Sequence, residues 1–163
     1  MSQPVIHLEE YYLEKILVER TRQATDEITI TFDHDYKIKR NADNPHEFAL
    51  TFIVRDNPAL KTPHPQVYTL DLRITGFFRF NKGADEDQMQ YLIRFNGCTI
   101  LYGILRGMLA TITGTFPEGA IRMPTIMIDE IVKKVEGLSD RPQTRKTAKK
   151  TIKKTIRTPP NKK

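Results

Sequence analysis

The sequence predicts an α+β fold in which an antiparallel sheet is followed by one long helix and one short helix. Three stretches between residues 28 and 80 alternate apolar and polar side chains, which is typical of strands with one buried and one solvent-facing side. Apolar residues at helical spacing follow, first in a long run and then in a short one. With 163 residues and 39% hydrophobic content, the chain has room for one soluble domain, and a second full domain is excluded.

The alternating stretches predict strands over residues 28–38, 48–54 and 70–80. Prolines lie between these strands, at Pro45 and within residues 58–65, where they remove no hydrogen bond from a sheet. Strands linked in this way predict an antiparallel meander. The expected core-facing side chains are Ile28, Ile30, Phe32, Tyr36, Ile38, Phe48, Leu50, Phe52, Val54, Leu70, Leu72, Ile74, Phe78 and Phe80.

The segment from Tyr11 to Arg20 is ambiguous. Its sequence, YYLEKILVER, places Tyr12 and Ile16 on one side of a helix, and it fits a two-sided strand equally well. Periodicity therefore leaves both assignments open for this segment.

A long helix is predicted from about residue 85 to residue 113. It begins with three acidic residues, which are favourable at a helix N-terminus, and Gly114 and Pro117 end it. The stretch from Phe95 to Ile112 approaches the length of a membrane span. Because Arg106 lies inside this stretch, burial in a soluble core is the expected environment.

The two sides of this helix differ in composition. Counted from Met89, ten of the twelve positions on one side are apolar, and the exceptions, Asn96 and Gly97, predict a kink or distortion. The other side carries small residues that let a second backbone approach closely. These residues are Thr99, Gly103, Gly107 and Ala110. Because glycine costs a helix about 1 kcal/mol relative to alanine, we expect a compensating contact, either with a helix of another subunit or with the short helix of the same chain.

The short helix is predicted from residue 125 or 126 to about Glu136, and Gly137 closes it. Its apolar residues fall on one stripe, as expected for a helix that packs on a core. They are Ile128, Ile131, Val132 and Val135.

The composition changes after this helix. Residues 138–163 contain ten Lys or Arg and one acid, Asp140, whereas residues 1–137 carry a net charge of −3. The basic segment has too few apolar groups to offset the entropy of ordering, so we expect a domain over residues 1–137 and a disordered basic tail over residues 138–163. This tail could bind a nucleic acid or an anionic membrane surface; a solvated tail is the simpler alternative.

No motif for catalysis, a metal or a cofactor is found in the sequence. The four histidines are scattered, and there are neither paired cysteines nor a Gly-rich phosphate loop. In Asp33-His34-Asp35 a strand would point the carboxylates and the imidazole to opposite faces, which excludes a local dyad. The sequence therefore predicts a protein that is not an enzyme and that uses no cofactor, unless catalytic groups converge in space.

The expected compartment is the cytoplasm. The first ten residues, MSQPVIHLEE, contain no cationic segment followed by an apolar run. The single cysteine, Cys98, cannot form an intrachain disulfide and is expected to be a small buried apolar group.

The order of these elements and several motifs resemble the SecB family of protein-export chaperones. Residues 12–19, YLEKILVE, resemble the first strand of the family, which assigns the ambiguous segment as a strand. Gly76-Phe77-Phe78 resembles the end of its fourth strand, and the strongest likeness covers residues 96–132, including the Gly-Thr-Phe-Pro corner at 114–117. The resemblance implies an α+β fold with a four-stranded antiparallel sheet followed by a long helix and a short C-terminal helix.

The resemblance also implies a function. Members of this family are ATP-independent holdases that bind unfolded polypeptides, use no nucleotide or metal, and deliver export clients to the SecA motor. They are homotetramers, built as dimers of dimers, in which first strands pair across one interface and long helices pack across another. The small-residue side of the predicted helix agrees with such packing. Some SecB-like proteins instead serve an antitoxin or other clients unrelated to export, and this alternative stays open.

Two sets of site residues follow from the resemblance. A holdase must leave apolar side chains accessible and able to repack. The candidates for a client-binding groove are Tyr12, Phe77, Phe95, Ile121, Met123, Ile126 and Met127, for each of which ordinary core packing is the alternative. SecA docking in the family uses acids on the outer sheet face; Glu19 and Asp71 match two of them, whereas Lys15 stands where another acid aligns.

Overall fold

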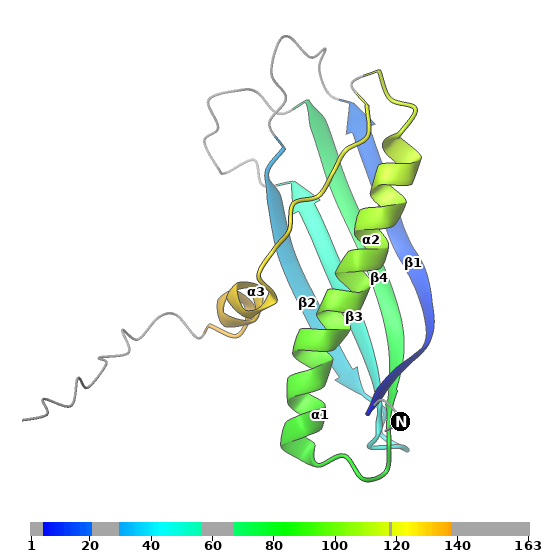
Figure 1. The fold of residues 1–163 in the computed structure, drawn as a ribbon, viewed down its shortest axis with the longest axis vertical. Coiled ribbons are helices and arrows are strands. Elements are labelled where there is room, and N and C mark those ends of the chain that lie inside the picture. Colours follow the sequence, from blue (N-terminus) through cyan, green and yellow to red (C-terminus); the bar gives the residue numbers. More distant parts are fainter. Residues whose placement is uncertain (1–4, 21–29, 57–66, 118, 138–163) are drawn as a thin grey trace, which may run out of the picture.

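A four-stranded antiparallel sheet lies against a layer of helices in the computed structural model, which describes residues 5–20, 30–56, 67–117 and 119–137 (Figure 1). The strands are β1 (Ile6–Arg20), β2 (Phe32–Arg40), β3 (Glu47–Asp56) and β4 (Tyr68–Phe80). The helices are α1 (Glu86–Leu92), α2 (Cys98–Thr113) and α3 (Ile128–Val135), and a π-helical turn, Ile93–Gly97, joins α1 to α2. The predicted α+β fold is confirmed. The predicted basic tail, residues 138–163, lies outside the described residues.

The strand order in the sheet is β1-β4-β3-β2, and each neighbouring pair is antiparallel. The predicted meander is confirmed for β2, β3 and β4, and β1 pairs with the other edge of β4. Two irregularities in β1, between Leu8 and Glu10 and between Leu13 and Lys15, shift its register. Because a bulge changes which side chains face the core, residues 11–20 fit no single alternating pattern.

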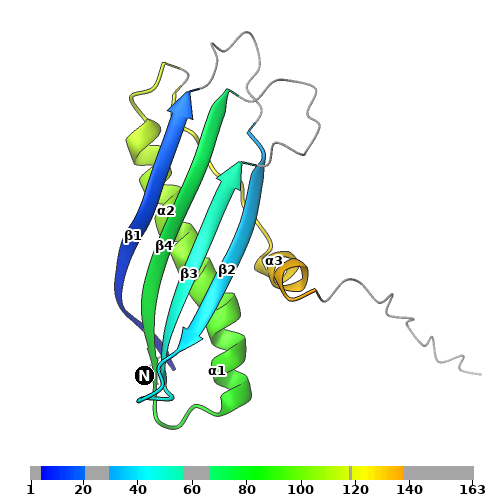
Figure 2. The ribbon, with the colours of Figure 1, turned by 180° about the vertical axis from the view of Figure 1, so that it is seen from behind.

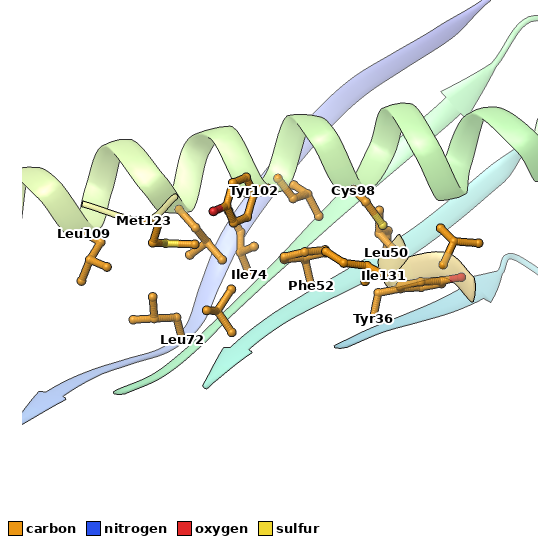
Figure 3. Packing of buried hydrophobic residues seen from close by; sticks show 14 of the residues in the cluster. Tyr36, Leu50, Phe52, Leu72, Ile74, Cys98, Tyr102, Leu109, Met123 and Ile131 are labelled. Atoms are coloured by element: carbon orange, nitrogen blue, oxygen red, sulfur yellow. The ribbon is translucent and has the colours of Figure 1, made fainter. Parts of the chain in front are cut away.

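The central strands β3 and β4 supply most of the core beneath the helices, part of which Figure 3 shows. Nine predicted core residues of these strands are buried: Phe48, Leu50, Phe52, Val54, Leu70, Leu72, Ile74, Phe78 and Phe80. In β2, Tyr36 is buried, whereas Phe32 and Ile38, and Ile30 just before the strand, are only partly buried near this edge of the sheet. Ile28 lies outside the described residues.

The predicted distortion at Asn96-Gly97 is confirmed by the π-helical turn that ends at Gly97. Gly97 lies against the sheet, where a Cβ atom would be 2.8 Å from Leu50 Cδ2 and 3.3 Å from Ile93 Cδ1. A side chain here would force the Leu50 and Ile93 side chains to shift, so glycine favours this close approach of the helix to β3. The π-helical turn also inserts one residue into the helical repeat.

The inserted residue shifts the buried side of the long helix, so only part of the apolar face counted from Met89 is buried beyond the turn. One residue corresponds to a rotation of about 100°. Beyond the turn, the buried row is Cys98, Leu101, Tyr102, Leu105 and Leu109. Four apolar residues of the predicted face form a second, less covered row: Ile100, Ile104, Met108 and Ile112. Of these, Ile100 is 37% exposed and Ile112 is 45% exposed.

After α2 the chain returns as an extended segment, residues 119–127, and then forms α3 (Figure 1). The Ile121 backbone N–H donates to Thr113 Oγ1 at 2.8 Å, and the Tyr102 hydroxyl donates to the Pro124 carbonyl oxygen. These two bonds tie the extended segment to α2. The helix α3 therefore begins a few residues later than predicted, at Ile128.

The short helix α3 packs against β2 and the π-helical turn. At its C-terminal end, Glu136 accepts a hydrogen bond from the Tyr36 hydroxyl at 2.8 Å, and its Oε1 lies 2.5 Å from Arg94 Nε. Ile131 and Val132, which belong to α3, are buried. These contacts fix α3 over the edge of the sheet, away from the small residues of α2.

Candidate functional site

The face of the sheet opposite the helices, here called the outer face, carries no helix in the part of the chain that the structure describes (Figure 2). Two predicted client-binding residues lie on it. Tyr12 in β1 is paired with Thr75 of β4, and Phe77 lies two residues further along β4. The Tyr12 and Phe77 rings have centroids 6.0 Å apart, and the residues are 47% and 40% exposed. They form an exposed aromatic pair.

Three further predicted client-binding residues lie on the helical side of the molecule. Phe95 in the π-helical turn is partly buried and stacks on exposed Tyr91, with ring centroids 4.5 Å apart. Met127, which precedes α3, is 62% exposed, and Ile126 is partly buried against the core. The accessible residues of the predicted set are therefore divided between two faces of the chain.

The last two residues of the predicted groove, Ile121 and Met123, are core residues in this chain. They are 6% and 1% exposed, and Figure 3 shows Met123 among the buried side chains beneath α2. Their burial follows from the extended conformation of residues 119–127, which turns these alternate side chains towards the sheet. The seven residues thus form no single groove within one chain, and their role in client binding stays a prediction.

The two acids predicted to dock SecA have different environments on the outer face. Glu19 is exposed, near the end of β1. Asp71 in β4 lies 2.7 Å from Lys15 Nζ, 3.3 Å from Arg73 Nη2 and 3.5 Å from Arg55 Nε. Partial burial opposes ionisation of Asp71, but the hydrogen bonds from Lys15 and Arg73 outweigh it and lower the pKa of this carboxyl. The Asp71 charge is therefore neutralised within the chain.

The small-residue side of α2 faces away from the sheet. Thr99, Gly103 and Gly107 are exposed and Ala110 is partly buried. A Cβ atom built at Gly103 or Gly107 would have no described neighbour within 4 Å. Because α3 packs elsewhere, the alternative that the short helix of the same chain covers this side is wrong.

The second apolar row, defined by Ile100, Ile104, Met108 and Ile112, borders these small residues. By length and composition, the helix Glu86–Thr113 is the one candidate for a membrane span in the described residues, and 33% of its most apolar stretch is buried. Its buried row fills the core above the sheet. The helix is thus apolar on a second side that the described residues leave partly open.

A hollow of about 390 Å³ lies on the outer face near the β2–β3 turn. Phe77, Ala49 and Lys39 follow one another across β4, β3 and β2 in the paired register. Arg79 and Glu47 form the next row towards the end of the sheet. The hollow therefore has an apolar centre with charged groups around it.

The Asp33-His34-Asp35 cluster does not form a catalytic dyad. The His34 ring packs against Phe52 and Tyr102, with centroid distances of 6.3 and 5.7 Å, and burial lowers its pKa. Asp33 instead accepts a hydrogen bond from Lys134 of α3, which lowers the pKa of the Asp33 carboxyl. The expected separation of the imidazole from the carboxylates is therefore found.

The other described side chains that could act as a nucleophile or bind a metal do not form a cluster. Cys98 is buried as predicted, and burial raises the pKa of its thiol to about 12. No group of three or more His, Cys, Asp or Glu that could hold a metal ion occurs in the described ranges.

Comparison with known proteins gives a likeness in structure. No family model and no curated protein matches the chain. Among solved structures it is similar to the SecB-like chaperone Rv1957 of Mycobacterium tuberculosis, in complex with a ChAD peptide from the antitoxin HigA1 (Rv1956). The TM-score is 0.59 and the sequence identity 15%, covering 75% of this chain and 90% of that chain. The chain has a SecB-like fold.

This likeness is in fold and, at 15% identity, does not establish membership of the family. A protein of unknown function from Streptococcus agalactiae is also similar, with a TM-score of 0.41, 7% identity and coverage of 74% of this chain and 97% of that chain. The functional argument for this SecB-like chain therefore depends on its own surfaces.

Sequence reasoning missed two of these surfaces. Ala49 sits between two core residues of β3, so alternation turns it outward, but only the strand register reveals that it lies between Phe77 and Lys39. The second apolar row was assigned to the core, although Asn96-Gly97 already indicated a break in the helical repeat. A helical repeat counted with one inserted residue at that break predicts the observed shift of the buried row.

Proposed function

We propose that this protein is an ATP-independent holdase that binds unfolded polypeptides and limits their aggregation. The observation that carries the proposal is the exposed aromatic pair, Tyr12 and Phe77, on the outer face of a SecB-like fold. Grouped apolar side chains in contact with water are typical of a binding surface. Burial of apolar side chains of a client supplies the free energy of such binding without a nucleotide.

The proposed clients are polypeptides unrelated to export, such as an antitoxin or another dedicated partner. The similar chaperone of Mycobacterium tuberculosis is in complex with a peptide of an antitoxin, which supports a polypeptide client. Docking to SecA would need an accessible acidic surface, whereas Asp71 is surrounded by Lys15, Arg55 and Arg73. An export role with SecA as partner is therefore the weaker alternative.

The proposed active form is a cytoplasmic homotetramer, built as a dimer of dimers. The open side of α2, with Gly103, Gly107 and Ile100, would pack against α2 of a second copy. The strand β1 lies at an edge of the sheet, so it would pair with β1 of another copy. Both contacts leave the outer face accessible to clients.

An aggregation assay tests this function. The full chain, in several-fold excess, should suppress light scattering by a chemically denatured client diluted into buffer. A Tyr12→Ser/Phe77→Ser double variant should lose most of this effect, because it removes the exposed aromatic pair without touching the buried core. Thermal unfolding of both proteins controls for folding. Equal aggregation with and without the wild-type chain would contradict the proposal.

A second candidate function follows from charge. Ten Lys or Arg in residues 138–163 would bind a nucleic acid or another polyanion without sequence preference. This function predicts retention on immobilised DNA that falls steeply with added salt and is lost when residues 138–163 are deleted. Suppression of aggregation by the deleted form would separate the two functions.

A further inference from the structure

We propose that the hollow on the outer face binds a large apolar side chain of an extended polypeptide together with an acidic side chain two residues away. This inference rests on the proposed function, because it assumes that the outer face binds polypeptides. It goes beyond that function by naming the sequence that the surface selects. The residues that define it are Phe77, Ala49 and Lys39.

The apolar part of the hollow arises from a mismatch in size between neighbouring strands. Ala49 of β3 lies directly opposite Phe77 of β4 in the sheet register. Tyr12 packs near the Phe77 ring from β1, but the short Ala49 side chain leaves space on the other side, and Phe77 remains 40% exposed. An exposed aromatic wall above a small residue is a seat for an apolar side chain.

The volume of the hollow indicates what fits. At about 390 Å³ it is near the lower end of the range for small-molecule pockets, which is roughly 300–1,000 Å³. It is open on the outer face, where no described helix covers it. One or two side chains of a bound polypeptide match this size better than a large cofactor does.

The charges at the rim indicate an acidic neighbour. Arg40 is engaged by both carboxylate oxygens of Glu86, at 3.1 and 2.8 Å, and Arg79 is paired with Glu9 at 2.8 Å. The two carboxylate oxygens of Glu47 accept hydrogen bonds from the side-chain amides of Asn41 and Asn44.

Lys39 differs from these rim residues. It is exposed, and it has no ion pair or hydrogen bond to any residue in the described ranges. The amides that bond Glu47 are neutral and leave its charge in place, so the rim carries both signs. Lys39 lies in the same row as Ala49 and Phe77, where it would favour a carboxylate on the bound segment.

The spacing of the sheet sets the sequence of the bound segment. Neighbouring strands lie about 4.8 Å apart, and side chains two residues apart on an extended chain lie about 6.8 Å apart on the same side. A segment crossing the sheet with an apolar side chain above Ala49 therefore places a residue two positions away within reach of the long Lys39 side chain. The expected motif is an apolar residue, any residue, and Asp or Glu.

Binding of short fluorescent peptides to the full chain tests the inference. The probes are three otherwise identical Gly/Ser peptides that contain Phe-x-Asp, Phe-x-Lys or Ala-x-Asp. Wild-type protein should bind Phe-x-Asp about tenfold more tightly than either other peptide, because each lacks one of the two contacts. Ala49→Leu should fill the hollow and abolish the preference for Phe, and Lys39→Glu should reverse the preference for Asp over Lys.

A matched control is Lys37→Glu, which makes the same charge change at an exposed residue of β2 outside the hollow. It should keep the preference for Asp. If the wild-type chain binds all three peptides equally, or if Ala49→Leu and Lys39→Glu leave the preferences unchanged, the inference is wrong while the holdase function stands. If the wild-type chain neither binds peptide nor suppresses aggregation, both are wrong.

Another occupant of the hollow is also tested. If Ala49→Leu changes the mass of the assembly but leaves the peptide preferences unchanged, the hollow is filled by a second copy of the chain. That result would overturn the inference. Lys39→Glu changes an exposed side chain, so it keeps the test valid even if Ala49→Leu does not fold.

Discussion

The two sides of the long helix use glycine for different purposes. At Gly97, on the side that faces the sheet, a Cβ atom would lie 2.8 Å from Leu50 Cδ2, so any larger residue would force the buried Leu50 side chain to shift. At Gly103 and Gly107, on the opposite side, nothing in the described residues lies within 4 Å of such an atom. Glycine at these two positions lowers helix stability and gains no close contact with the part of the chain that the structure describes.

The difference shows where the packing of a single chain ends. The sheet-facing side is completed by neighbours such as Leu50 and Phe52. The open side combines two glycines with Ile100 and Ile112, which are 37% and 45% exposed. Small residues beside isoleucines suit a helix packed at close range. This composition supports the proposed packing of the open side between copies of the chain.

Truncation of a large side chain should have the largest effect on the sheet-facing side. Leu105→Ala removes a side chain that is 1% exposed and should lower the free energy of unfolding by about 2–5 kcal/mol. Ile100→Ala, on the open side, should cost less than about 1 kcal/mol in dilute protein and more as concentration rises, because assembly stabilises the folded state. Urea unfolding at two protein concentrations measures both. Equal costs at low concentration would contradict the difference between the sides.

The same substitution at two glycines sharpens the comparison. Gly97→Val should destabilise the chain by about 1–3 kcal/mol, because the new side chain overpacks against buried Leu50. Gly103→Val should change the stability of the single chain by less than about 0.5 kcal/mol, since valine and glycine differ little in helix propensity and space is open. Thermal unfolding of dilute samples distinguishes the two variants. A larger loss of stability for Gly103→Val than for Gly97→Val would contradict the difference between the two sides of the helix.

A smaller change in the free energy of unfolding is expected with pH. It arises from His34, which packs on the sheet-facing side of the helix. His34 packs against Tyr102 of α2, and burial lowers its pKa in the folded state below the usual value of 6.5. Below that pH the unfolded chain binds a proton that the folded chain does not, so the free energy of unfolding falls as the pH drops from about 7 to about 5. His34→Gln should flatten this dependence in urea unfolding, leaving the assembled mass unchanged. If the free energy of unfolding of the variant changes with pH as steeply as that of the wild type, His34 is not the source of the pH dependence.

Much of the fold could be predicted from the sequence because the central strands are one-sided. Alternation in β3 and β4 identified nine buried residues, since one face of these strands meets the helices and the other does not. β1 could not be assigned by the same rule because its two irregularities interrupt the alternation. The π-helical turn rotated the helix beyond Gly97, which the count of apolar positions did not include.

The candidate site was less predictable, because it depends on neighbours from distant parts of the sequence. Ile121 and Met123 are apolar residues near the end of the domain, and only the path of the extended segment shows that they are buried. Asp71 is an acid in sequence, yet its three cationic neighbours come from β1, β3 and β4. The hollow depends on the register of β3 against β4, which a local pattern does not contain.

The mass of the protein in solution tests the central claim most directly, namely that the open side of α2 joins copies of the chain. By analytical ultracentrifugation, the wild-type protein should sediment as a tetramer, four times the chain mass of 18.9 kDa. A Gly103→Leu/Gly107→Leu variant should remain folded by circular dichroism and have a smaller mass, because leucine blocks close helix packing. A wild-type protein that remains a monomer of 18.9 kDa at all concentrations would contradict the account.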